Sequence, residues 1–469
     1  MMETHLLKRM VHALVSNQSR IGDDPHRPLW HLSPSVGLLN DPNGFIHHNG
    51  RYHLFYQWNP LACAHGAKFW GHWSSANLVH WRHEPVALVP SEHYETHGCY
   101  SGSAVVDDGA IVLIYTGNVK YDDGSRTAFQ CLARENAAGE YDKLGPVLDL
   151  PPGYTGHVRD PKVWRHDAHW YMVLGAQDKQ RQGKVLLFRS GDLRHWDNIA
   201  EIAGSRLGGL GDFGYMWECP DLFRLNQQEV LICCPQGIPA EGERYLNTFQ
   251  AGYFVGTLDY QRGHYQHNCF SELDLGFEFY APQTTESEDG RRLMFGWMSM
   301  PDENEFFDPT IEQGWLHTMT CPRELTLRAD KLYQHPVREL QQLRTRHYTW
   351  QGVASDAPQL PVNSAEVILA SQGEFQLDIA SQLVVCWDGE RLVLSRRNRR
   401  TGEVEHRYWR GELRQLQILF DRSSIEIFIN DGVATMSANC FPDGDATLSF
   451  SGTGRLALQH WLLAPCMIE

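Results

Sequence analysis

Apolar runs of strand length recur along the first two thirds of the chain at nearly constant spacing. In five segments a small polar motif precedes a turn and then an apolar strand, and the strands begin at Tyr52, Ile111, Trp170, Val230 and Leu293. These starts lie 59 to 63 residues apart, which indicates an internal repeat. Each repeat holds three or four strand-like runs, and no long segment of helical period separates them. The pattern predicts a five-bladed β-propeller over roughly 30–330. A β-sandwich with accidental spacing is the weaker alternative.

The pattern changes after the fifth repeat. Residues 331–353 are partly helical in character and predict a linker. From residue 354 to 469, short alternating runs separated by turns predict a β-sandwich. At the N-terminal end, segment 1–29 contains apolar residues at helical spacing, namely Leu6, Leu7, Met10, Leu14 and Val15. This spacing predicts a short amphipathic helix packed on the body of the protein. The expected fold class is therefore all-β, a propeller followed by a sandwich.

Composition narrows the functional classes. The 469 residues are 42% hydrophobic and 21% charged, as in a globular protein, and the formal charge is −16. This acidic balance argues against nucleic acid or a membrane surface as the main partner. Charged residues interrupt the first 20 positions, so neither a signal peptide nor a membrane span is expected. The 11 cysteines lack metal-site spacing, which favours reduced thiols in a cytoplasmic protein, a monomer or a homodimer.

The polar motifs that open the five repeats can be aligned with one another. They are NDPNG (40–44), YSGS (100–103), RDPK (159–162), ECPD (218–221) and YAPQ (280–283). In a propeller the first strand of each blade lines the central channel, so matching positions converge at one mouth of that channel. We therefore expect Asp41, Asp160 and Glu218, treated as equivalent repeat positions, to meet there.

Convergent carboxylates suit glycoside hydrolysis, in which one attacks the anomeric carbon and another protonates the leaving oxygen. A third can accept hydrogen bonds from sugar hydroxyls, and Arg159 can keep a neighbouring carboxylate ionised. An Asp-Pro pair alone usually marks only a turn, and any single aromatic residue is more often core than ligand contact. The combination carries the prediction, together with residues able to stack on or hydrogen-bond a sugar: Gln57, Trp58, Trp70, Trp73, Tyr100, Tyr280 and Trp297.

Long segments of the chain resemble the family-32 glycoside hydrolases. They include LLNDPNGFIHHNGRYHLFYQWNP, HVRDPKVW, MWECPDLF and FEFYAPQ, and the likeness runs from about Trp30 to the C-terminus. The resemblance implies a five-bladed propeller and a sandwich, with retention of configuration and no metal or organic cofactor. It implies Asp41 as nucleophile, Glu218 as general acid/base and Asp160 as transition-state stabiliser. The candidate substrate-binding positions are Leu39, Asn40, Gln57, Trp58, Trp70, Tyr100, Ser101, Arg159, Tyr280 and Trp297.

The resemblance also bears on the substrate. QWNPLACAHGAKFWGHWSS and CCPQGIPAEGERYLNTF are most similar to bacterial cytoplasmic members that act on sucrose 6-phosphate, although His65-Gly66 stands where many invertases carry Trp-Gly. Binding a phosphate requires cations near the glucose end of the pocket. Arg244 is the first candidate for this contact, and the other candidates are Lys68, Lys120, Arg126, Lys179 and Arg181. The alternatives are an invertase acting on free sucrose or short fructans, an inverting glycosidase or fructosyltransferase, and a non-catalytic sugar-binding protein.

Overall fold

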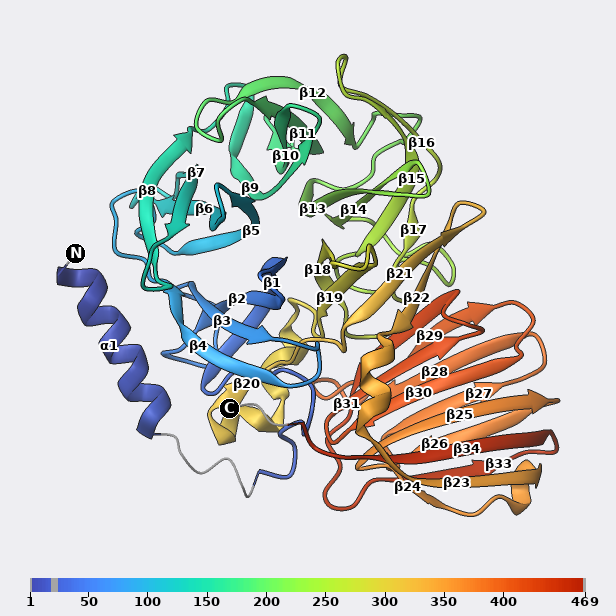
Figure 1. Cartoon of the computed structure of the whole chain (residues 1–469). Helices are drawn as coiled ribbons and strands as arrows, with labels where there is room; N and C mark the ends of the chain where they lie inside the picture. Colours follow the sequence, from blue (N-terminus) through green and yellow to red (C-terminus); the bar gives the residue numbers. More distant parts are fainter. Residues whose placement is uncertain (1, 18–23, 467–469) are drawn as a thin grey trace.

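The computed structural model describes residues 2–17 and 24–466 (Figure 1). Within these ranges the chain forms a helix, α1 (Met2–Asn17), then five sheets around a central axis, and finally two packed sheets. This confirms the all-β prediction of a propeller followed by a sandwich. The parts of the predicted segments 1–29 and 354–469 that fall at residues 1, 18–23 and 467–469 lie outside the described residues.

The five propeller sheets follow one another along the chain. The first contains β1 (Gly37–His48), β2 (Arg51–Asn59), β3 (Phe69–Ser75), β4 (Trp81–Leu88) and the short β20 (Trp315–Leu316). The second contains β5 (Cys99–Asp107), β6 (Ala110–Lys120), β7 (Arg126–Glu135) and β8 (Tyr141–Leu148). The third contains β9 (Tyr154–His166), β10 (His169–Asp178), β11 (Gly183–Ser190) and β12 (Asp197–Gly204). The fourth contains β13 (Met216–Leu225), β14 (Gln228–Gln236), β15 (Gly252–Asp259), β16 (His264–His267) and β17 (Ser271–Glu272). The fifth contains β18 (Tyr280–Glu286), β19 (Arg292–Trp297), β21 (Arg323–Arg328) and β22 (Lys331–Pro336).

The first strand of each repeat lies innermost, around the axis. β1 contacts β5 and β18, β9 contacts β5 and β13, and β13 contacts β18, so the five strands close a ring. β20, which lies between β19 and β21 in the chain, pairs in parallel with β1 and ties the last repeat to the first. The repeat therefore places the five polar motifs on neighbouring strands around one channel.

The sandwich consists of two six-stranded sheets within the described residues. One contains β23 (Arg344–Val353), β25 (Ser364–Gln372), β30 (Gln415–Asp421), β31 (Ser424–Ile429), β32 (Ala434–Asn439) and β34 (Arg455–Leu463). The other contains β24 (Leu360–Pro361), β26 (Phe375–Ile379), β27 (Leu383–Trp387), β28 (Arg391–Arg397), β29 (Val404–Arg410) and β33 (Thr447–Ser451). Alternating apolar residues of both sheets, such as Leu377, Val385 and Ile418, are buried between them.

The structure corrects the predicted linker over 331–353. β22 completes the fifth propeller sheet by pairing with β21, a 3-10 helix follows at Arg338–Leu343, and β23 is already an edge strand of the sandwich. The hydrophobic pattern concealed β23 because most of its residues are polar and exposed, as an edge strand permits. Further 3-10 helices occur at Glu303–Phe307, Pro309–Gln313 and Ala354–Asp356.

The N-terminal helix packs on the propeller with only part of its predicted apolar face. Val11 is buried and Leu7 and Val15 pack beside it, whereas Leu6, Met10 and Leu14 are exposed. No helix in the described ranges has the length and apolarity that a membrane crossing requires.

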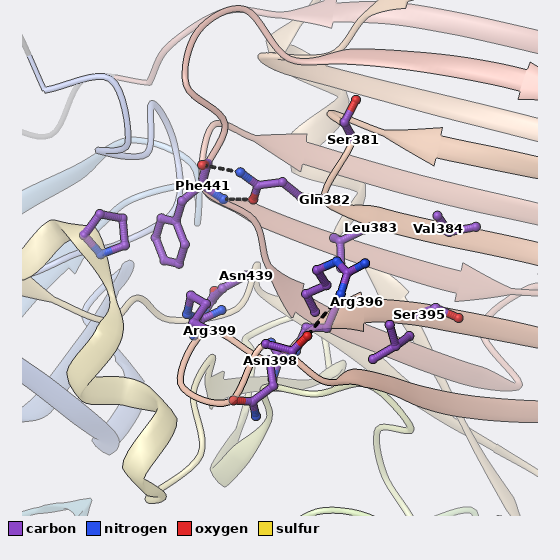
Figure 2. A pocket seen from close by; sticks show the side chains of 14 residues that line it. Ser381, Gln382, Leu383, Val384, Ser395, Arg396, Asn398, Arg399, Asn439 and Phe441 are labelled. Carbon is purple, nitrogen blue, oxygen red and sulfur yellow. Dashed lines mark hydrogen bonds between the residues drawn. The ribbon is translucent and has the colours of Figure 1, made fainter.

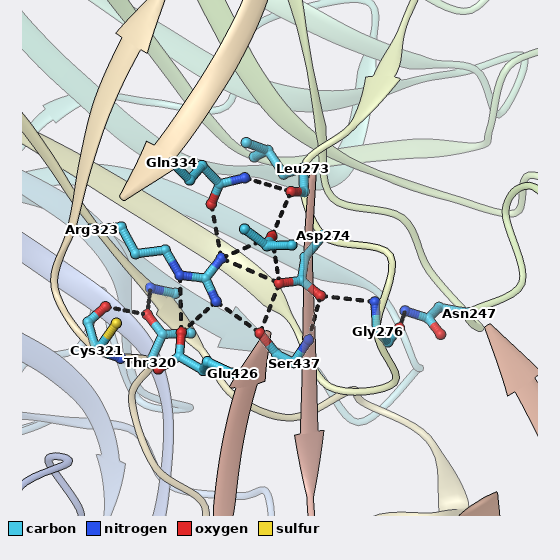
Figure 3. A network of polar contacts seen from close by, with 12 residues as sticks. Asn247, Leu273, Asp274, Gly276, Thr320, Cys321, Arg323, Gln334, Glu426 and Ser437 are labelled. Carbon is cyan, nitrogen blue, oxygen red and sulfur yellow. Dashed lines mark hydrogen bonds and ion pairs between the residues drawn. The ribbon is translucent and has the colours of Figure 1, made fainter. Parts of the chain in front are cut away.

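A buried charged network joins the propeller to the sandwich (Figure 3). Arg323 on β21 donates two hydrogen bonds to Glu426 on β31, at 2.5 and 3.0 Å, and one to Asp274 at 3.2 Å. Asp274 in turn accepts a 2.7 Å bond from the hydroxyl of Ser437 on β32. His31 reaches the same Glu426 at 2.8 Å. Because these partners lie on both domains, the network fixes how the sandwich sits against the propeller.

Candidate active site

The inner strands enclose a pocket of about 390 Å³ at one mouth of the channel. All three predicted acids line it, from three different blades: Asp41 on β1, Asp160 on β9 and Glu218 on β13. The predicted substrate-binding residues that also line it are Asn40, Gln57, Tyr100, Ser101, Arg159, Tyr280 and Trp297.

A β-bulge at each motif places these residues at the channel. Pairing with the second strand of each blade shifts register at the motif in all five inner strands. Three residues at the bulge have positive φ, at +66° for Asp160, +48° for Cys219 and +49° for Ala281. A bulge turns a side chain out of the regular alternation, and left-handed backbone in a non-glycine residue is a strain that typically persists at functional sites.

The bulges also correct the idea that the three acids occupy one repeat position. Asp160 is the bulged residue before proline, and Asp41 aligns with it. Glu218 stands one residue earlier, at the paired position that Arg159 and Tyr280 occupy in their own blades. The three acids therefore occupy two different positions of the motif. The position that Asp160 occupies in the third blade is occupied by Cys219 in the fourth.

Asp41 is held by two hydrogen bonds. The hydroxyl of Ser101 donates to its Oδ2 at 2.5 Å, and the side-chain amide of Asn40 donates to Oδ1 at 3.0 Å. Burial raises the pKa of the Asp41 carboxyl and the charge of Glu218 raises it further, while the two hydrogen bonds and the charge of Lys68 lower it. The carboxyl is thus oriented by fixed donors.

Asp160 lies deepest among charges of both signs. Its Oδ2 accepts a 2.9 Å bond from the backbone N–H of Cys219, and the thiol of Cys219 lies 3.7 Å from both Asp160 and Asp41. Burial raises the pKa of Asp160 to about 7; Arg159 opposes this, and the charges of Glu218 and Asp41 add to it. The pocket therefore retains a proton near neutral pH.

Glu218 accepts hydrogen bonds on both carboxyl oxygens. Arg159 donates to Oε1 from Nε at 3.0 Å and from Nη2 at 2.5 Å. The side-chain amide of Gln236 and the hydroxyl of Tyr280 each donate to Oε2 at 2.7 Å. These contacts aim the carboxyl into the pocket, where it can exchange a proton with a bound ligand or water.

Four predicted site residues lie away from the pocket wall. Leu39 is buried in the core. The indoles of Trp58 and Trp70 are also buried and donate to the carbonyls of Val36 and Tyr100. Side chains alternate along β2, so Gln57 faces the channel and Trp58 faces the opposite side. Arg244 is exposed and packs on the Tyr245 ring, 4.5 Å from its centroid.

The pocket contains residues that the motif alignment did not identify. Gln236, Phe249 and Pro301 line it, as do three of the predicted cations, Lys68, Lys120 and Arg126; Lys179, Arg181 and Arg244 do not. Gln236 had a detectable signal, because it is the last residue of the second strand of the fourth repeat, and Gln57 lies near the end of the second strand of the first repeat.

A second cavity of about 560 Å³ lies on the sandwich (Figure 2). Three of its polar side chains are bonded within the chain: Gln382 exchanges two hydrogen bonds with the backbone of Phe441, while Arg396 and Asn398 donate to Glu405. No carboxylate lines it. The chemistry-bearing site in the described residues is the propeller pocket.

Comparison with known proteins agrees with this geometry. The family model described as glycosyl hydrolases family 32 N-terminal domain matches residues 31–336, and the model for the family-32 C-terminal domain matches 339–461. A sucrose-6-phosphate hydrolase of Klebsiella pneumoniae is 56% identical, with 99% of both chains covered.

Two solved structures extend the likeness to the whole fold. A family-32 β-fructofuranosidase of Bombyx mori is 35% identical, with a TM-score of 0.89 and 99% of this chain and 100% of that chain covered. A sucrose-6-phosphate hydrolase of Lactobacillus gasseri is 30% identical, with a TM-score of 0.89 and 97% and 96% covered.

Proposed function

The chain belongs to glycosyl hydrolase family 32, and from that premise we propose that it hydrolyses the β-fructofuranosyl bond of sucrose 6-phosphate, releasing fructose and glucose 6-phosphate. One observation carries the proposal: Asp41, Asp160 and Glu218 line a single pocket that also contains the cations Lys120 and Arg126. The similarity to sucrose-6-phosphate hydrolases over nearly the full chain supports the same substrate. A phosphorylated sugar is an intracellular substrate, so we place the enzyme in the cytoplasm.

In this reaction Asp41 attacks the anomeric carbon of the fructosyl unit and Glu218 protonates the departing glycosidic oxygen. A covalent fructosyl-enzyme forms, and Glu218 then removes a proton from the water that releases fructose, so the configuration is retained. Ser101 and Asn40 orient Asp41 for the attack. Asp160 accepts hydrogen bonds from sugar hydroxyls as positive charge develops on the ring.

The proton that bond cleavage needs comes from the same cluster of acids. Burial raises the pKa of Asp160 to about 7, and repulsion from the neighbouring carboxyl groups of Glu218 and Asp41 adds to this shift against the opposing charge of Arg159. In the free enzyme Arg159 pairs with Glu218. A bound sugar that draws the Arg159 guanidinium to its own oxygens would leave Glu218 able to take the shared proton.

Arg126 and Lys120 replace Arg244 as the proposed phosphate contacts. Arg126 Nη2 donates to Asn118 at 2.5 Å and Nη1 lies 3.3 Å from His157 Nδ1, but its buried Nε–H has no partner in the described residues. Burial, with Arg159 and Arg126 nearby, lowers the pKa of His157 to about 4, so this imidazole is neutral. A phosphate in this part of the pocket would meet two cations, Arg126 and Lys120.

The test compares sucrose with sucrose 6-phosphate in Arg126→Met and Lys120→Met. We expect the KM for sucrose 6-phosphate to rise about 10-fold or more, as the loss of a charge-assisted hydrogen bond implies, and the KM for sucrose to change less than about 3-fold. Arg244→Met, an exposed cation outside the pocket, is the matched control and should leave both values unchanged. Equal effects on the two substrates would contradict the phosphate site, and a wild-type preference for free sucrose would move the substrate to sucrose itself.

A further inference from the structure

Lys68 is a buried cation directly behind the proposed nucleophile. It precedes β3, is 6% exposed, and donates from Nζ to Asn40 Oδ1 at 2.6 Å. The same Asn40 amide also contacts Asp41, because its Nδ2 donates to Asp41 Oδ1 at 3.0 Å. One chain of hydrogen bonds therefore runs from the ammonium group of Lys68 to the carboxyl of Asp41.

This chain fixes which way the Asn40 amide faces. An ammonium group can only donate, so the amide must present its oxygen to Lys68 and its NH₂ group to Asp41. Without the ammonium group, nothing in this chain prevents the amide from turning its oxygen toward the carboxylate, where two acceptors would repel. Lys68 thus determines that Asp41 receives a donor.

A second group of side chains holds Lys68 from behind. Its Nζ lies 3.0 Å from His65 Nδ1, and His65 Nε2 lies 3.3 Å from Glu305 Oε1. The other oxygen of Glu305 lies 3.3 Å from His317 Nε2 without a hydrogen bond between them, while His317 Nδ1 lies 3.1 Å from the carbonyl of Leu39. Since Leu39 precedes Asn40, the His317 imidazole contacts the same strand, β1, that carries Asp41.

The fold maintains an unfavourable backbone conformation at this point. His317 is 3% exposed and has φ of +74°, in the left-handed region that residues with a Cβ rarely adopt. Glu305 is 4% exposed and belongs to the 3-10 helix Glu303–Phe307. Strained and buried polar residues next to a reaction centre indicate a positional requirement.

We propose that Lys68 is a positioning residue for the reaction, which orients Asp41 through Asn40 and is itself held by His65, with Glu305 behind that imidazole. The proposal rests on the proposed function, in which Asp41 is the nucleophile. Lys68 faces Asp41 and Glu305 as charged groups, with His65 in contact. Burial lowers the pKa of Lys68 to about 8, and the charges of Asp41 and Glu305 oppose that shift, so the ammonium group persists at neutral pH.

The direction of the pH effect follows from the charges. The Lys68 charge lowers the pKa of Asp41, so its removal raises that pKa, and ionised Asp41 is then reached only at higher pH. The acid limb of kcat/KM should move upward, by about half a pH unit or more. Because the contact acts on the nucleophile, kcat should fall about 10- to 100-fold while KM changes less than about 3-fold.

The experiment measures kcat, KM and the pH profile on sucrose for Lys68→Met and Lys68→Arg, with the exposed Lys179→Met as control and Asp41→Asn alongside. Lys68→Met should show both effects, Lys68→Arg should keep the wild-type acid limb, and Lys179→Met should match the wild type. A Lys68→Met variant with wild-type kcat and acid limb would overturn the inference. If Asp41→Asn stays active, the proposed function fails first; if it is inactive while Lys68→Met is normal, only this inference fails.

Glu305→Gln gives a second measurement in case Lys68→Met does not fold. This variant keeps Lys68 but removes the negative charge of Glu305. Lys68 should then lose its proton at lower pH, and the alkaline limb of the kcat–pH profile should move to lower pH. An unchanged alkaline limb with wild-type kcat in a folded Glu305→Gln would contradict the role of Lys68.

Discussion

Two regions of this molecule bury several charged groups, and they do so in opposite ways. In the propeller pocket three carboxyl groups face one another, with Arg159 as the cation paired to Glu218. At the propeller–sandwich junction, acidic and basic groups alternate through Asp274, Arg323, Glu426 and His31. The pocket brings three carboxyl groups together although cations also line it, whereas at the junction each charged group contacts a group of opposite charge (Figure 3).

The pKa values record the difference. At the junction, Arg323 and His31 outweigh burial and lower the pKa of Glu426 to about 2, and the hydrogen bonds that Asp421 and Glu426 accept from His31 raise the pKa of that imidazole to about 9 against burial. In the pocket, burial raises the pKa of Asp160 to about 7. Buried charges whose partners outweigh the effect of burial stay ionised, and removing one partner is costly. A buried carboxyl group beside other carboxyl groups is shifted toward its neutral form and remains available for proton transfer.

The largest expected effect is on activity in the pocket. Glu218→Gln keeps the shape of the side chain but removes the proton-transfer group, so kcat/KM for sucrose 6-phosphate should fall by about 10³-fold or more. Its thermal stability should stay close to that of the wild type, because the loss of repulsion within the cluster is offset by the loss of the buried ion pair with Arg159. Substantial residual activity, or a marked loss of stability, would remove the contrast with the junction.

The next effect is on stability at the junction. Arg323→Met leaves Asp274 and Glu426 buried without their cation, so the free energy of unfolding should fall by about 3–5 kcal/mol. Below its melting temperature the variant should keep a kcat close to that of the wild type. Arg328→Met on the same strand is the matched control, because Arg328 is exposed and its ion pair is with the exposed Asp431; it should cost less than about 1 kcal/mol. Denaturant unfolding of both variants distinguishes the two cases.

The smallest effect is a gain in stability from removing a buried acid. Asp160 has a higher pKa in the folded chain than in the unfolded chain, so between these values the native state binds the extra proton and stability falls as pH rises. Asp160→Asn should therefore be inactive yet more stable by about 1–3 kcal/mol at pH 8, with a smaller gain at pH 5. A variant that is less stable at pH 8 would show that Asp160 is a structural partner.

Much of the pocket could be predicted from the sequence because the repeat is visible there. The constant spacing of strands placed Asp41 and Asp160 at one mouth of a channel. The one-residue offset of Glu218 depends on how each bulge pairs with its second strand, which spacing does not record. The same limit explains Trp58 and Trp70, since the face that each side chain occupies follows from local register.

The junction could not be predicted at all. Arg323 and Glu426 lie 103 residues apart, and His31 and Glu426 lie 395 apart, so no local pattern links them before the two domains dock. Arg126 was one of six candidate cations, and only the closed propeller shows that it lines the pocket while Arg244 does not. Interactions made by docking carry no periodic signal in the sequence.

The most direct test of the central claim is to identify the residue that becomes covalently attached to fructose. Glu218→Ala, given a fructofuranoside with a leaving group that needs no protonation, should form the intermediate and release it slowly, because the base for water is missing. Peptide mass spectrometry after rapid quenching should find one fructosyl unit on the peptide that contains Asp41, at Asp41. Attachment to another residue, or rapid turnover without any attached sugar, would contradict the account.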